Sequence, residues 1–228
     1  MAGNHKRLVI AIDGPAGSGK STVSKLVAKR LGLVYIDTGA MYRALTLKAV
    51  RSGIDLEDEG ALVELARSTD VDLKYDNGRQ IVLLDSEDVA GLIRTAELTK
   101  KVKYIARVPG VRHEMVRMQR RMGERSGAVM EGRDITTVVF PDADHKFYLD
   151  ADPEERTLRR FKELKGSGSS VTLDEIRRDV ASRDDSDMRR EVGALKIADD
   201  AVVVDTTHLS IEGVVEKVLS YISASGDR

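Results

Sequence analysis

A glycine-rich stretch near the start of the chain limits its fold more than any other feature. Gly14-Pro15-Ala16-Gly17-Ser18-Gly19-Lys20-Ser21 matches the pattern G-x-x-x-x-G-K-S/T. The apolar run 8–12 precedes it, and an amphipathic helical pattern from about residue 20 to 31 follows. A buried strand, a tight loop and a helix N-terminus in this order hold phosphate groups, because backbone N–H groups and the helix dipole attract anions. The sequence therefore predicts a phosphate-binding loop (P-loop).

The residue types in this loop suit a nucleoside triphosphate. Lys20 can reach the β- and γ-phosphates, and the Ser21 hydroxyl can ligate Mg²⁺. A glycine-rich turn without a ligand is the plainer alternative. We expect ATP with Mg²⁺, Ser21 as the metal ligand, and ATP-binding residues Gly14, Pro15, Ala16, Gly17, Ser18, Gly19, Lys20, Ser21 and Thr22. The loop alone does not separate transferases from motors and switch GTPases.

Four further apolar runs, at 33–36, 128–130, 146–149 and 201–204, each lie near a helical pattern. Strands that alternate with helices imply right-handed crossovers and a parallel sheet. Together with the run at 8–12, these segments predict an α/β fold in which helices flank a five-stranded parallel sheet.

Two segments interrupt this alternation. Residues 71–75 and 80–84, joined by a turn at Asp76-Asn77-Gly78, predict an antiparallel hairpin, because Asn-Gly readily takes the positive φ angles of tight turns. A Gly/Ser tip at 166–170 lies between a helical pattern starting near Pro153 and another that opens at Thr172 with Glu175 three residues on, a capping box. We interpret the second segment as the end of a mobile helical lid.

Composition limits the partners. The 37 Lys+Arg and 38 Asp+Glu give a formal charge of -1, so no global field draws the protein to nucleic acid or anionic lipid. The chain has no Cys, which excludes disulfides, thiolate metal ligands and cysteine nucleophiles. No apolar run approaches the roughly 20 residues of a membrane span. We expect a cytoplasmic monomer that binds neither a nucleic-acid polymer nor a membrane.

Arginines follow two of the predicted strands. Transfer between two phosphates needs cations that hold both anions in line. The second strand leads into Asp37-Thr38-Gly39-Ala40-Met41-Tyr42-Arg43, where Thr38 is a candidate helix cap. The third ends in Glu131-Gly132-Arg133-Asp134, at the sheet edge where open α/β sheets bind ligands. An ordinary helix start and a structural Arg–Asp ion pair are the plainer alternatives.

These segments, in order, resemble the bacterial-type cytidylate kinases, a family of P-loop nucleoside monophosphate kinases. The resemblance covers essentially the whole chain. Its most specific parts are the segment 37–43 and Gly132-Arg133-Asp134 followed by Thr137-Val138-Val139-Phe140-Pro141-Asp142-Ala143. It implies transfer of the γ-phosphoryl group of ATP to CMP or dCMP, giving ADP and CDP or dCDP. It also implies a kinase core at 1–67 and 96–228, with a lid at about 153–185 and a nucleoside-monophosphate-binding insert at 68–95.

The resemblance also implies residue roles. Thr38, Arg43, Arg133 and Arg190 resemble the clamp on the acceptor phosphate, and Arg183 and Asp187 the ribose contacts. Asp134 and Arg112 resemble the cytosine readers, since Asp134 can accept from the exocyclic amine and Arg112 can donate to the ring. Arg156, Arg159 and Arg160 resemble lid arginines that close on ATP, although a solvated helix face has the same spacing. The implied catalytic set is Lys20, Arg43, Arg133, Arg183 and Arg190. The implied CMP-binding set is Asp37, Thr38, Arg43, Arg112, Arg133, Asp134, Arg183, Asp187 and Arg190.

The departures from the family pattern include Lys103 and Thr136. Lys103 stands where the family places a Ser against the base, and an ammonium group can only donate. A kinase for UMP or another small acceptor therefore stays open, as does a P-loop regulatory switch. Thr136 replaces a Gly of the family, which is acceptable only where φ is negative.

Overall fold

The computed structural model describes residues 8–76, 79–166 and 170–226. The chain forms two compact units: one contains Met1–Tyr35 and Gly127–Arg228, and the other contains Ile36–Ser126. The insert expected at 68–95 falls inside the second unit. The finer division into core, lid and insert stays a prediction.

The predicted five-stranded parallel sheet is confirmed. Its strand order is β2-β6-β1-β7-β8. The register places Asp13, the last residue of β1, beside Gly132 of β6 and Tyr148 of β7. Each expected run matches a strand within a residue or two. The strands are β1 (Val9–Asp13), β2 (Val34–Asp37), β6 (Ala128–Gly132), β7 (His145–Asp150) and β8 (Val202–Asp205).

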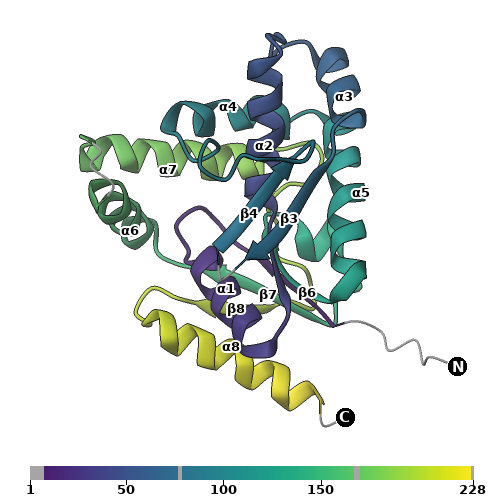
Figure 1. The fold of residues 1–228 in the computed structure, drawn as a ribbon. Coiled ribbons are helices and arrows are strands. Elements are labelled where there is room, and N and C mark those ends of the chain that lie inside the picture. The colour runs from purple at the N-terminus through teal and green to yellow at the C-terminus, as the bar shows by residue number, and fades with distance from the viewer. Residues whose placement is uncertain (1–7, 77–78, 167–169, 227–228) are drawn as a thin grey trace, which may run out of the picture. The chain divides into compact units, whose positions relative to one another are not determined.

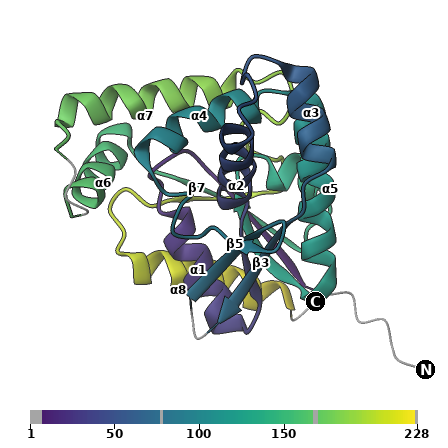
Figure 2. The ribbon, with the colours of Figure 1, turned by 45° about the horizontal axis from the view of Figure 1, so that its top comes forward.

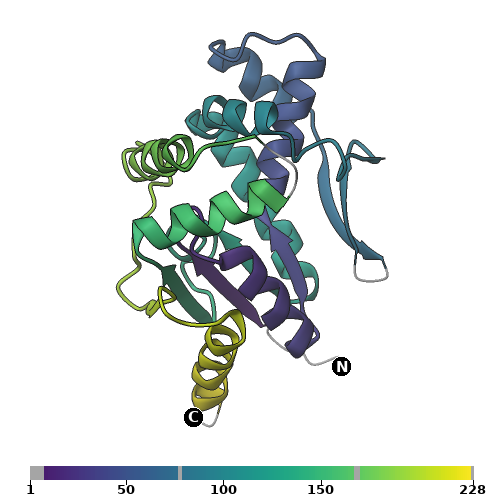
Figure 3. The ribbon, with the colours of Figure 1, turned by 90° about the vertical axis from the view of Figure 1, so that its left-hand side faces the viewer.

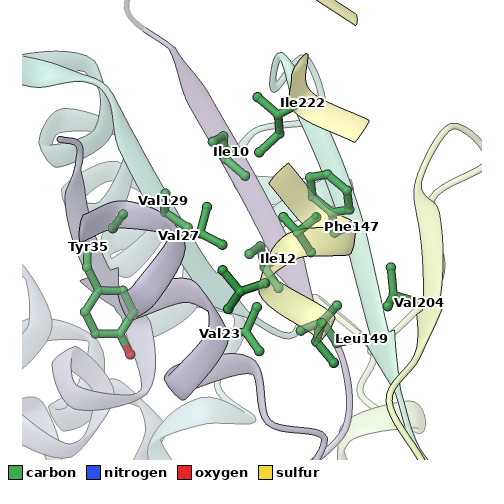
Figure 4. Close-up of a cluster of buried hydrophobic side chains, with 14 residues drawn as sticks. Ile10, Ile12, Val23, Val27, Tyr35, Val129, Phe147, Leu149, Val204 and Ile222 are labelled. Atoms are coloured by element: carbon green, nitrogen blue, oxygen red, sulfur yellow. The ribbon is translucent and has the colours of Figure 1, made fainter. Parts of the chain in front are cut away.

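Helices α1 (Lys20–Leu31) and α8 (Ile211–Gly226) pack against each other and share one hydrophobic core with the sheet (Figure 1). Ile10 and Ile12 of β1 point into this core and meet Val23 and Val27 of α1 (Figure 4). Burying each such side chain contributes about 1.5–3 kcal/mol relative to leaving it exposed. The core thus fixes the strand that precedes the P-loop against the helix that follows it.

Two more helices of the first unit, α6 (Pro153–Gly166) and α7 (Leu173–Met188), lie side by side (Figure 1). The predicted capping box at Thr172 and Glu175 opens α7. Ser167, Gly168 and Ser169 of the expected tip lie outside the described residues.

The second unit combines helices with a small antiparallel sheet. The predicted hairpin is confirmed, and its two long strands lie side by side (Figure 3); Asn77 and Gly78 of its turn lie outside the described residues. A third strand, β5, was not predicted, because two residues are too few to show alternation. The strands are β3 (Val71–Asp76), β4 (Arg79–Leu84) and β5 (Glu87–Asp88).

The helices of the second unit pack in pairs, α3 against α5 (Figure 2) and α2 against α4. Val111, Met115, Met118 and Met122 form a buried stripe on α5, as the helical spacing predicts. None of the described helices combines the length and the apolar content that a membrane span requires. The helices are α2 (Thr38–Arg51), α3 (Glu59–Arg67), α4 (Ala96–Ala106) and α5 (Pro109–Ser126).

Candidate active site

The P-loop lies between β1 and α1, and two of its glycines are required by close backbone contacts. Gly14 has a φ of +152°, and a Cβ there would lie 2.1 Å from the carbonyl oxygen of Leu149. Gly17 has a φ of +80°, and a Cβ there would lie 3.0 Å from the carbonyl oxygen of Arg156. The loop is therefore packed against the end of β7 and the start of α6, which hold it in shape.

Lys20 is buried in this loop at 5% exposure. Its Nζ donates a hydrogen bond of 2.8 Å to the carbonyl oxygen of Pro15. Burial lowers the pKa of Lys20 to about 7, and Arg133 acts in the same direction, while nearby carboxylates including Glu131 oppose them. A phosphate in the loop would add negative charge and favour the ammonium form. Lys20 is thus a cation that anion binding would stabilise.

Ser21 and Thr22 lie exposed on the first turn of α1. Among the described residues, no cluster of three or more His, Cys, Asp or Glu side chains has the arrangement to hold a metal ion. Mg²⁺ commonly takes one or two protein ligands and fills its remaining positions with phosphates and water. An exposed hydroxyl beside the loop fits an ion that arrives with a nucleotide.

A carboxylate bridges two arginines near the end of α7. The Nε of Arg133, which follows β6, donates to Asp187 Oδ2 at 2.6 Å. The guanidinium of Arg190 donates to the other oxygen, Asp187 Oδ1. Burial opposes ionisation of Asp187, but Arg133 and Arg190 together hold its pKa below the ordinary value. Asp187 also interacts electrostatically with Lys20, so the structure brings these four predicted residues together.

Asp134 is buried and precedes a single π-helical turn, η1 (Ile135–Val139). The ion pair of Arg133 is formed with Asp187, 54 positions along the chain. Among the described residues other than glycine, only Asp85 and Ser86 have positive φ, so Thr136 meets the condition that its replacement of Gly imposes.

The predicted lid arginines make contacts of three different kinds. Arg156 is buried at 4% exposure and donates to the carbonyl oxygens of Ala151 and Ala16, at 3.0 and 3.1 Å. Its guanidinium also pairs with Asp184 of α7 at 2.7 Å. A solvated helix face therefore does not describe Arg156, which joins the P-loop to α7.

The other arginines of this region are less buried. Arg159 donates to the hydroxyl and carbonyl oxygens of Thr206, which follows β8, at 2.9 and 2.6 Å. Arg160 pairs with Glu163 at 2.7 Å on the same helix. Arg183 pairs with Asp179 at 2.9 Å, and burial lowers its pKa.

In the second unit, the carboxylate of Asp37 interacts with a helix N-terminus and with two arginines. Its Oδ1 accepts from the backbone N–H of Ala40 at 2.8 Å, so Asp37 caps α2. The expectation that Thr38 caps this helix is wrong; Thr38 is its first residue. Arg43 and Arg94 approach Asp37 Oδ2 at 3.2 and 3.5 Å.

Arg112 is buried at 3% exposure, above the ring of Tyr42. One of its Nη atoms donates to the carbonyl oxygen of Ala106 at 3.2 Å. Lys103 is exposed, and its Nζ lies 5.0 Å from the centre of the Tyr104 ring. Arg112 lies in the second unit, whereas Asp134 lies in the first.

Four residues without a predicted role contact residues named above: Asp13 contacts Thr136, Arg94 contacts Asp37, Asp184 contacts Arg156, and Thr206 contacts Arg159. Asp13 immediately precedes the P-loop, and Arg94 lies at the end of the predicted insert. Asp184 and Thr206 carry no local signal, since their partners lie far along the chain.

The chain is similar to proteins of one family. A family model described as cytidylate kinase matches residues 10–224. The cytidylate kinase of Clostridioides difficile (strain 630) is 48% identical over 216 residues, covering 95% of this chain and 98% of that protein. A cytidylate kinase of Caldicellulosiruptor bescii is 47% identical over 214 residues, with 94% and 95% covered. An uncharacterized protein from Eubacterium ventriosum ATCC 27560 has a TM-score of 0.51 at 12% identity, covering 95% of this chain and 99% of that one, which shows a likeness of fold alone.

Proposed function

Since the chain belongs to the cytidylate kinase family, we propose that it transfers the γ-phosphoryl group of ATP to CMP or dCMP. The products are ADP and CDP or dCDP. One observation carries the mechanism: Arg133 and Arg190 meet on Asp187, in electrostatic contact with Lys20 of the P-loop. Cations that hold two phosphates beside each other are the main requirement of phosphoryl transfer.

The P-loop binds the donor phosphates in this proposal. Backbone N–H groups of residues 16–19 surround the β-phosphate, and Lys20 exchanges the carbonyl oxygen of Pro15 for phosphate oxygens. Ser21 is the side chain assigned to Mg²⁺, which when bound neutralises charge on the β- and γ-phosphates. Thr22 completes the first turn of α1 beside this site.

The acceptor needs no general base, because its phosphate is already an anionic nucleophile. We assign Arg133 and Arg190 of the first unit to that phosphate, and likewise Thr38 and Arg43 of the second, with Asp37 orienting Arg43. Guanidinium groups match phosphate oxygens in geometry and stabilise charge that moves during transfer.

The sugar and base contacts remain assignments by resemblance. A carboxylate offers about four lone pairs, so Asp187, which accepts from Arg133 and Arg190, can also accept from a ribose hydroxyl beside Arg183. Arg112 and Asp134 are assigned to cytosine. Uracil presents the reverse donor and acceptor pattern at those positions, so this pair favours cytosine.

The lid arginines divide by burial. Arg160 pairs on the surface with Glu163, and an exposed ion pair of this kind is worth about 1 kcal/mol or less, so it is readily redirected to ATP. Arg159 reaches ATP only by exchanging contacts with Thr206. Arg156 supports ATP binding through the loop carbonyl of Ala16. Lid closure would exclude water and limit ATP hydrolysis.

The proposal includes action in the cytoplasm, by a monomer whose substrates are small molecules rather than a nucleic-acid polymer or a membrane.

An acceptor panel tests the substrate assignment. ADP release from ATP and Mg²⁺ is measured with CMP, dCMP, UMP, AMP or no acceptor. We expect kcat/KM for CMP and dCMP to exceed that for UMP by at least about a hundredfold, because buried groups that pair with cytosine are left unpaired by uracil.

Lys103→Ser is the matched variant for this panel, since it restores the residue type of the family. Comparable CMP and UMP rates in the wild type, with selectivity regained in the variant, would assign relaxed specificity to Lys103. ADP release that is independent of any acceptor would contradict the kinase assignment and favour a switch.

A further inference from the structure

Asp13, the last residue of β1, is completely buried, with 0% of its surface exposed. Its carboxylate accepts three hydrogen bonds from the start of η1. Oδ1 accepts from the backbone N–H of Ile135 at 3.0 Å, and Oδ2 accepts from the backbone N–H and the hydroxyl of Thr136, both at 2.7 Å. These bonds join segments more than a hundred residues apart in the chain.

The three hydrogen bonds, together with the sheet, restrain the backbone on both sides of Arg133. Asp13 pairs with Gly132 in the sheet, so the backbone is held at Gly132 and again at Thr136. Arg133 and Asp134 lie between these two points. The side chain of Asp134 does not cap η1, although Asp134 holds the cap position. Asp13 supplies that cap from another strand.

We propose that Asp13 and Thr136 form a positioning pair that fixes the backbone of Arg133 beside the P-loop for phosphoryl transfer, an inference that rests on the proposed kinase function. Asp13 is followed at once by Gly14 of the loop, so one residue restrains both the donor site and the arginine assigned to the acceptor. Neither member touches substrate in this proposal.

The Thr136 hydroxyl gives this chain a donor that the glycine of the family pattern lacks. A buried carboxylate keeps its charge only where donors compensate for lost water. Burial raises the pKa of Asp13 to about 6, the bonds from Thr136 and Ile135 oppose that shift, and Asp134 adds to it. Among the described residues, Lys20, Arg133 and Tyr148 also interact electrostatically with Asp13.

Protonation disturbs this arrangement, because three donors already face the two oxygens. A protonated carboxyl group has to donate one hydrogen and accepts less well at that oxygen. Activity should therefore fall as the pH decreases through the pKa of Asp13, and it should fall at a higher pH when the Thr136 hydroxyl is removed.

The test compares Thr136→Val, which keeps the shape and removes the hydroxyl, with Thr136→Ser, which keeps the hydroxyl. Thr137→Val is the matched control, because Thr137 is the adjacent, half-buried threonine and makes none of the three hydrogen bonds to Asp13. The readout is kcat with CMP as a function of pH, together with KM for ATP and CMP.

We expect the acid limb of kcat to move up by about one pH unit in Thr136→Val, since hydrogen bonds to charged groups are of that size. Near pH 6 this lowers kcat roughly fivefold to tenfold, while above about pH 8.5 kcat stays within about threefold of the wild type. Thr136→Ser and Thr137→Val should keep the wild-type limb.

Hydrogen exchange of peptides covering residues 132–140 gives a second readout that needs no activity. In Thr136→Val the backbone N–H groups of η1 should exchange at least about tenfold faster than in the wild type and Thr136→Ser. The positioning pair would be overturned if Thr136→Val had the same exchange rates and the same acid limb as the wild type. It would also be overturned if Thr136→Ser showed the same changes as Thr136→Val. A wild type without CMP kinase activity would instead contradict the proposed function.

Discussion

Replacing Arg133 by alanine is expected to lower kcat for CMP phosphorylation by at least about a thousandfold, the effect of removing an arginine that stabilises the transferring phosphate. ATP binding to the P-loop should change by less than about threefold, because Arg133 is assigned to the acceptor side. Steady-state kinetics and ATP titration calorimetry give both quantities. Arg133→Lys should recover only part of the rate, since an ammonium group lacks the planar fork.

The control for this change is Arg189→Ala. Arg189 is next to Arg190 but is 80% exposed and pairs with Asp185 on its own helix. Its loss should leave kcat within about twofold, as expected for an exposed ion pair. Thermal unfolding shows whether Arg133→Ala is folded, because this variant loses the charge-assisted hydrogen bond from Arg133 to the buried Asp187. If the Arg133→Ala protein is folded and its kcat, from the same steady-state kinetics, is within about tenfold of the wild-type value, Arg133 does not belong to the clamp.

Lys20→Met is expected to lower kcat/KM by at least about a hundredfold without lowering stability. The reason lies in the pKa of Lys20, which burial lowers from its ordinary value of 10.5 to about 7. The unfolded chain therefore binds this proton more tightly than the folded chain does, so the ammonium charge opposes folding near pH 7. The wild type should gain stability from this group as the pH rises from about 7 to about 10.5, and Lys20→Met should lack that gain.

Urea unfolding at two pH values measures this contribution, with Lys25→Met as the matched control on the exposed side of α1. Lys25→Met should change neither activity nor the pH dependence of stability. Loss of activity in Lys20→Met together with a large loss of stability would contradict a phosphate-binding role and indicate a structural one. A loss of activity alone is the expected pattern, since functional sites commonly carry charges that do not favour folding.

Much of the sheet was predictable from sequence, because strands buried on both faces are continuous apolar runs. The P-loop was predictable for a related reason. Its glycines, its lysine and its place between strand and helix are all local features, and Lys20–Leu31 is the helix that the pattern predicts.

Other features depended on contacts that no local pattern shows. Asp37 and Thr38 are both good caps, and only the approach of the Ala40 N–H to Asp37 decides between them. The ion pair of Arg133 lies with Asp187 rather than with its neighbour Asp134. Arg156 has the spacing of a solvated helix face, yet packing against the P-loop buries it.

Label transfer from ATP carrying a radioactive γ-phosphoryl group tests phosphoryl transfer to CMP most directly. ATP, Mg²⁺, CMP and the purified protein are incubated, and the labelled products are separated. If the protein is a cytidylate kinase, label appears in CDP, one CDP forms for each ADP, and little inorganic phosphate is released. Label found only in inorganic phosphate, at the same rate with and without CMP, would contradict phosphoryl transfer.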